Sequence, residues 1–113
     1  MALDIQINLQ PEKAAELINH AIVEGSVTGV LIDNYVVNGE QGKLCIVSVY
    51  DKHYYRDGNR LTLTVVIDNM EGTTKVHCIS GGGGEGLFRF DWGASESFEY
   101  CVENELAQYK IWL

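Results

Sequence analysis

The chain has 113 residues, of which 46% are hydrophobic and 21% are charged. This length and composition predict one globular domain, residues 1–113, with a single core. Eight Lys and Arg residues against sixteen Asp and Glu residues give a formal net charge of −8 at pH 7. Because this charge repels phosphate groups, we expect neither nucleic acid nor an anionic membrane as a partner.

We expect neither a membrane-spanning segment nor a signal peptide, because the sequence lacks a long apolar stretch and a basic, then apolar, N-terminal region. Its three cysteines, Cys45, Cys78 and Cys101, are widely spaced, and each lies within an apolar pattern. Metal sites usually contain close pairs such as Cys-x-x-Cys, which are absent from this sequence. We therefore expect reduced, packed cysteines in a cytoplasmic protein, with no metal, no disulfide and no cofactor.

The N-terminal residues predict a strand followed by a helix. Apolar and polar residues alternate from Leu3 to Leu9, which is typical of a strand with one buried face. Pro11 suits the first turn of a helix, and apolar residues then recur at helical spacing. Gly25 follows as a residue that commonly ends a helix.

Four further strands are predicted, separated by turns rich in glycine, asparagine and aspartate. They cover residues 27–37, 43–55, 61–68 and 74–80. Residues 44–49 are mostly apolar at both alternating positions, which is typical of a strand that is central or covered on both faces. The third of these strands alternates apolar residues with threonines, so its threonine face meets solvent or a partner.

A glycine-rich stretch, Ser80 to Gly86, interrupts the chain with five glycines in six positions. Glycine permits positive φ and a close approach of the backbone, so the stretch is interpreted as a connector, a bulge or a lid. An extended pattern resumes over residues 87–92, either as a separate strand or as a continuation after a bulge. From Phe98 to Leu113 apolar residues recur at helical spacing, which predicts a closing helix.

The predicted order is β-α-β-β-β-β(-β)-α, in one α+β domain. The connections between the later strands are too short for parallel crossovers, so the sheet is mainly antiparallel. Two helices then cover one face, which gives a two-layer sandwich similar in shape to the TATA-binding-protein-like and helix-grip folds. We expect the first helix to pack on the apolar face of the sheet through Leu17, Ile18 and Ile22 against Leu61, Leu63, Val65 or Ile67.

The first candidate site is a small-ligand pocket between the sheet and the closing helix, covered by the glycine stretch. The stretch is not a phosphate-binding loop, because Leu87 and Phe88 follow it instead of the required Lys and Ser or Thr. The alternative is that the aromatic residues only fill the core. The residues assigned to this site are Gly81, Gly82, Gly83, Gly84, Phe88, Phe90 and Trp92.

The second candidate site is a basic and aromatic hairpin tip in an otherwise acidic chain. Such a tip can contact an anion or an acidic partner surface. The alternative is a set of charges that keeps a sheet edge from aggregating. The residues assigned to this contact are Lys52, His53, Tyr55, Arg56 and Arg60.

No catalytic arrangement is recognisable in the sequence. His77 and Cys78 are adjacent on a predicted strand, so their side chains point to opposite faces and cannot form a thiolate–imidazole pair. A small enzyme would have to use His53, His77 or Glu85 as its acid or base, and nothing further in the sequence supports this.

Several segments resemble a small uncharacterised bacterial family, mostly from Firmicutes, that is classified as domain-of-unknown-function family 6054. The similar segments are residues 22–26, 44–50, 58–63, 79–82 and 87–90. The resemblance spans most of the chain. It implies a bacterial cytosolic protein, and it implies no activity, cofactor or site residue.

Three function hypotheses remain from different classes. The leading one is a non-catalytic cytosolic binding module with a pocket for a small molecule. The alternative is a homo-oligomeric interaction domain that uses the threonine-rich face or an edge strand. The third is the small enzyme, for which no catalytic residue is assigned.

Overall fold

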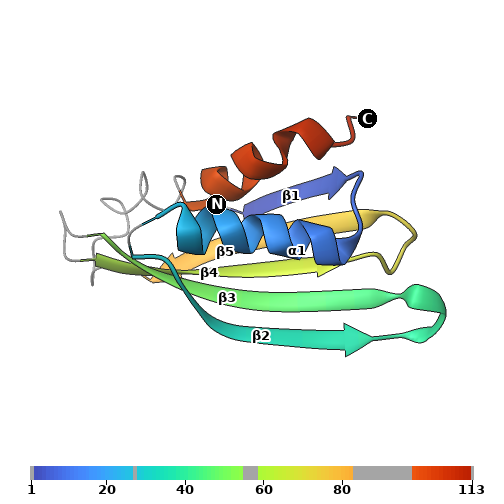
Figure 1. Cartoon of the computed structure of the whole chain (residues 1–113), viewed down its shortest axis with the longest axis horizontal. Coiled ribbons are helices and arrows are strands. Elements are labelled where there is room, and N and C mark those ends of the chain that lie inside the picture. Colours follow the sequence, from blue (N-terminus) through green and yellow to red (C-terminus); the bar gives the residue numbers. More distant parts are fainter. Residues whose placement is uncertain (1, 27, 55–58, 83–97, 113) are drawn as a thin grey trace.

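The computed structural model describes residues 2–26, 28–54, 59–82 and 98–112. In these residues a five-stranded antiparallel sheet carries α1 and a C-terminal helix on one face (Figure 1). The fold is therefore the predicted α+β two-layer arrangement. The predicted extended segment 87–92 and most of the glycine stretch lie outside the described residues.

The described elements follow the predicted order along the chain. They are β1 (Ala2–Ile7), α1 (Pro11–Asn19), a π-helical turn η1 (His20–Glu24), β2 (Val30–Asn38), a short 3₁₀ turn η2 (Glu40–Gly42), β3 (Leu44–Tyr54), β4 (Asn59–Asp68), β5 (Thr74–Gly82), a helix over residues 98–106 and a 3₁₀ turn η3 (Ala107–Tyr109).

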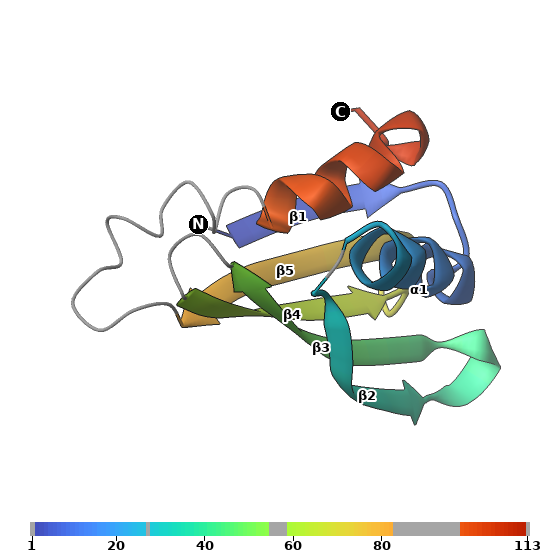
Figure 2. The same ribbon diagram turned by 60° about the vertical axis from the view of Figure 1, so that its left-hand side comes forward.

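The strand order in the sheet is β1-β5-β4-β3-β2. The last three strands follow one another as hairpins, and β2 precedes them at one edge. The N-terminal strand closes the other edge by pairing with β5, where Ile5 lies opposite Val76. This long-range pairing leaves β1 and β2 as the two edge strands (Figure 2).

The core lies between the helices and one face of the sheet. Ile18 and Ile22 are buried there as predicted, whereas Leu17 is only half-buried. The helix contacts β3 and β4, and the Tyr50 hydroxyl donates a 3.1 Å hydrogen bond to Asn19 Oδ1. The other large side chains that are fully buried come from β1, β4, β5 and the C-terminal helix: Ile7, Leu61, Leu63, Val65, Ile67, Val76, Phe98, Val102 and Leu106.

The end of the first helix depends on close backbone packing. The helix continues from α1 into the π-helical turn, in which the Gly25 amide donates to the His20 carbonyl at 3.0 Å. Gly25 has φ −85°, so it does not use the left-handed conformation that is common at helix ends. A Cβ atom at this position would lie 2.5 Å from the Ala21 carbonyl oxygen, which explains why glycine is needed.

Strand β5 continues two residues into the glycine stretch. Gly81 and Gly82 lie opposite Thr62 and Leu61 of β4, so they belong to the sheet and not to a connector. Gly82 has φ +92°, as expected for a residue of this stretch, and a Cβ atom there would lie 3.1 Å from the Arg60 carbonyl oxygen. The strand prediction therefore ended two residues too early, because glycine is usually depleted in strands.

Candidate functional site

The predicted small-ligand site is only partly within the described residues. Gly81 and Gly82 end β5, whereas Gly83, Gly84, Phe88, Phe90 and Trp92 lie outside the described residues. Where the C-terminal helix and the sheet are described, Phe98, Val102 and Leu106 fill the space between them and are at most 1% exposed. The ligand site thus stays a prediction, and the described part of the layer interface is packed core.

The predicted basic hairpin tip divides between the two faces of the sheet. Lys52 lies opposite the buried Leu61 on the helix-covered face, with its Nζ 5.8 Å from the centre of the Phe98 ring. Arg60 lies opposite His53 on the other face, and its guanidinium pairs with the Asp51 carboxylate.

Tyr55 and Arg56, the other two residues assigned to this tip, lie outside the described residues. Both backbone groups of His53 form hydrogen bonds with Thr28. Its amide donates to Thr28 Oγ1 at 3.2 Å, and its carbonyl accepts from that hydroxyl at 2.7 Å. These bonds join the segment before β2 to β3. An anion contact at this tip stays a prediction.

His77 and Cys78 lie on opposite faces of β5, as their adjacency predicted. His77 Nδ1 is 2.5 Å from a carboxylate oxygen of Asp4 on the open face, while Cys78 is fully buried. Burial, together with the nearby Glu99 carboxylate, raises the pKa of the Cys78 thiol to about 12. The thiol is therefore neutral at pH 7 and unsuited to act as a nucleophile.

The C-terminal end of the outer edge of β1 is covered by residues 109–111. The Asn8 amide donates to the Tyr109 carbonyl at 2.8 Å, and the Ile111 amide donates to the Gln6 carbonyl at 2.8 Å. Between these bonds, Ile7 and Lys110 form an antiparallel bridge. Residues 109–111 thus pair with this edge at Gln6 to Asn8. The predicted helix from Phe98 to Leu113 therefore ends at Leu106, because the last residues leave it to pair with β1.

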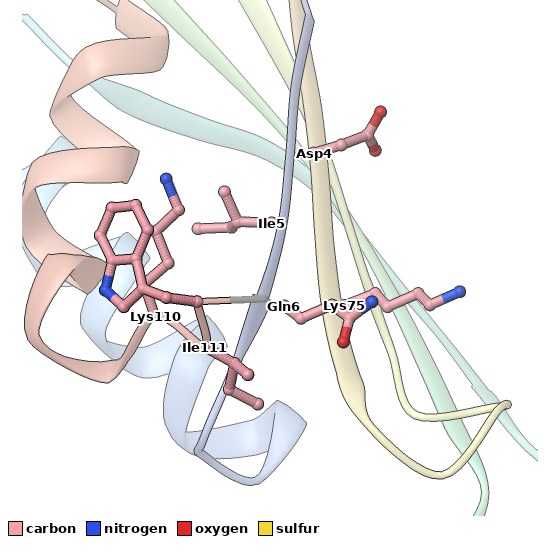
Figure 3. A pocket seen from close by; sticks show the side chains of 7 residues that line it. Asp4, Ile5, Gln6, Lys75, Lys110 and Ile111 are labelled. Atoms are coloured by element: carbon pink, nitrogen blue, oxygen red, sulfur yellow. The ribbon is translucent and has the colours of Figure 1, made fainter.

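An open pocket of about 480 Å³ lies beside this covered edge (Figure 3). Its side chains diverge, because Ile5 and Asp4 leave β1 in opposite directions. Both of its lysines have carboxylate partners, at 3.2 Å for Lys110 with Glu103 and at 2.6 Å for Lys75 with Glu71. These side chains do not converge on one point, so we assign no ligand to this pocket.

Among the residues that the structure describes, none covers the outer edge of β2. All nine residues of β2 are exposed, and among the described elements β2 pairs with β3 alone. Figures 1 and 2 show that β2 lies beyond the part of the sheet that the helices cover. Its backbone donors and acceptors on the outer side are therefore available to another strand.

The exposed side chains of β2 are mainly apolar. Among the described residues, six of the ten exposed large hydrophobic side chains belong to this single strand. Their exposed fractions range from 37% for Leu31 to 61% for Tyr35. We call these six residues the β2 patch: Val30, Leu31, Ile32, Tyr35, Val36 and Val37.

The β2 patch continues across the open face of the sheet. Tyr35 lies opposite Val47 of β3, which in turn lies opposite Val66 of β4. Both valines are only half-buried, since no described element covers this face above them. An apolar stripe thus runs inward from the edge, as is typical of an interaction surface.

Strand β2 lacks most features that protect sheet edges from pairing. Lysine and proline are absent from it, and Asp33 is its single charged residue. A bulge lies between Leu31 and Asp33, and the pairing with β3 is regular from Asp33 to Asn38. The regular part of the edge can therefore accept a partner strand.

The sequence predicted this strand but not its place in the sheet. Residues 27–37 show apolar side chains on both alternating positions, like the interior β3. The available signal was the polar pair Asp33 and Asn34 in the middle of the strand, which is unusual for a buried strand. The interaction hypothesis named an edge strand or the threonine-rich face without choosing between them.

Two general properties of the described residues accompany this site. They contain no group of three or more His, Cys, Asp or Glu side chains placed to hold a metal ion. None of their helices is long and apolar enough to cross a membrane.

In the described part of the chain, the fold is a small α+β domain in which the end of one edge strand is paired and the outer side of the other edge strand is not. A family model described as "Family of unknown function (DUF6054)" matches residues 1–110, so the chain belongs to this family. The comparisons with curated proteins and with solved structures found no match.

Proposed function

We propose that this protein is a protein-interaction domain that binds a partner strand along the outer edge of β2. The observation that carries the proposal is the contrast between the two edges. The end of β1, from Gln6 to Asn8, is paired by residues 109–111, whereas among the described residues the outer backbone of β2 has no partner and is flanked by the β2 patch. Addition of a strand to such an edge is a common mode of peptide and protein recognition.

The energetics favour a partner that covers side chains as well as backbone. Full burial of a large apolar side chain contributes about 1.5–3 kcal/mol, and association costs roughly 4–15 kcal/mol. Six half-exposed side chains offset a large part of that cost. The hydrogen bonds of the new strand pair then fix the direction and register of the partner.

The small-molecule hypothesis has less support among the described residues. Phe98, Val102 and Leu106 pack the interface between the layers, and the pocket beside β1 has no convergent polar groups.

The three cysteines are free, which supports the proposed cytoplasmic location, where thiols stay reduced.

Site-specific photo-crosslinking in the source organism tests this function. A benzophenone amino acid replaces Val37 in one variant and Lys13, on the exposed face of α1, in a matched control. We expect a discrete protein adduct from position 37 and none from position 13. Adding Tyr35→Lys should abolish the adduct, because it places a charge in the middle of the patch.

Two outcomes would contradict the proposal. One is the absence of a discrete adduct at position 37. The other is an adduct that persists with Tyr35→Lys, since the contact would then not depend on the β2 patch. An unchanged circular-dichroism spectrum of the Tyr35→Lys variant confirms that the substitution acts on binding and not on folding, as expected for a side chain that is 61% exposed.

A further inference from the structure

We propose that the partner strand is β2 of a second copy of the chain, so that two sheets join into one continuous antiparallel sheet. This inference rests on the proposed function and names its partner. The two copies are related by a two-fold axis perpendicular to the sheet, and the axis passes beside Tyr35.

The charge of the patch favours a second copy. The chain carries a net charge of −8, yet β2 contributes only Asp33. A surface that binds a basic partner usually presents several carboxylates to it, and β2 presents only one. The best match for this edge is an apolar, β-branched strand with few charges, and β2 itself has these properties.

The symmetry restricts the register of the strand pair. A two-fold axis perpendicular to the sheet keeps each side chain on its own face, and directly opposed residues share a face. One residue of β2 must therefore lie opposite its own copy. An axis at Asp33 would oppose two carboxylates, which is unfavourable.

An axis at Tyr35 fits the regular part of the strand best. It uses the regular segment after the bulge and opposes Asp33 to Val37 of the partner strand and Asn34 to Val36. It also pairs Tyr35, the most exposed member of the β2 patch, with its own copy. Aromatic pairs of this kind stabilise antiparallel strands.

This arrangement places the helices of both copies on the same face of a ten-stranded sheet, because each copy contributes five strands. The two open faces then form one surface, on which the apolar stripes of the two copies meet. The β2 patch of each copy is then flanked by β2 of the other copy, which has the same apolar residues.

Two lysine substitutions test self-pairing and its register together. Tyr35→Lys places two ammonium groups opposite each other on the axis, which is destabilising. Val37→Lys places a lysine opposite Asp33 of the other copy, so the charges are complementary in this register. The two substitutions add the same charge to neighbouring positions on the same face of β2.

Sedimentation equilibrium of the purified full chain provides the measurement. We expect a wild-type mass of twice the 12.6 kDa chain mass. Tyr35→Lys should raise the dimer dissociation constant by about tenfold or more, and Val37→Lys should change it by less than about threefold.

Each other outcome overturns self-pairing in this register. A dimer that is insensitive to Tyr35→Lys uses another surface, and a dimer that both substitutions weaken equally does not oppose residue 37 to Asp33. A wild-type chain that is monomeric at every concentration rules out the second copy as partner. If that monomer still forms the position-37 adduct with a different protein in cells, the proposed function stands without this inference.

Discussion

At the level of single residues, Ser26 and Gly29 fix the path from the first helix into β2. Ser26 Oγ donates to the Ile22 carbonyl at 2.9 Å and accepts from the Gly29 amide at 3.0 Å. A Cβ atom at position 29 would lie 2.1 Å from the Ile22 carbonyl oxygen. Glycine is therefore required here by close packing, and the start of the exposed strand is anchored to the buried end of the helix.

Gly29→Ala should lower the free energy of unfolding by about 1–3 kcal/mol, because the chain must shift to relieve the contact with Ile22. Gly81→Ala is the matched control, since an added Cβ atom there meets nothing closer than Thr62 Oγ1 at 3.8 Å. It should change stability by about 1 kcal/mol or less. Urea unfolding of both variants provides the comparison, and equal losses would contradict the packing role of Gly29.

At the level of elements, β4 shows the two faces of the sheet most clearly. Leu63 is fully buried under the helices, whereas the next residue, Thr64, lies half-buried on the open face. Substitutions at these two neighbouring residues therefore probe the two faces of the sheet separately: Leu63 reports on the packing between the layers, and Thr64 reports on the open face.

Leu63→Ala should cost roughly 2–5 kcal/mol, because it leaves a cavity between the helices and the sheet. Thr64→Ala should cost about 1 kcal/mol or less, since it removes only strand propensity and partial burial. Chemical denaturation measures both values. A loss below about 0.5 kcal/mol for Leu63→Ala, typical of a surface site, would remove this residue from the core.

Local periodicity was enough to predict α1 and most strand positions. Pro11 and the helical spacing of Ala14, Ile18 and Ile22 are short-range signals, and the structure buries all four residues. The alternation of Leu61, Leu63, Val65 and Ile67 likewise predicted which face of β4 is buried. Such patterns depend on neighbours within one element, so a single sequence contains them.

The sheet edges could not be predicted in the same way. The pairing of β1 with β5 joins Ala2 to Ile79, and nothing in either segment specifies the other. Residues 30–32 and 44–47 are apolar on both alternating positions, yet the first group is exposed at an edge and the second lies inside the sheet. The candidate site follows from the strand order, which is a long-range property of the fold.

At the level of the whole molecule, the two edges of one sheet have opposite character. Residues 109–111 cover the end of β1, whereas no described residue covers the outer edge of β2. Its acidic surface opposes nonspecific association, because like charges repel. In the proposed dimer, an apolar strand with one carboxylate would provide a specific route to assembly in a chain whose net charge otherwise repels its copies.

Residue-resolved amide hydrogen exchange tests this account most directly. In a free edge strand every second amide points away from its single neighbour and exchanges rapidly. We predict that all amides from Asp33 to Val37 are protected in the wild-type protein, and that every second one loses protection in the Tyr35→Lys variant while β4 stays protected. Rapid exchange at alternate amides of β2 in the wild-type protein, unchanged by Tyr35→Lys, would show that no second copy pairs with this edge.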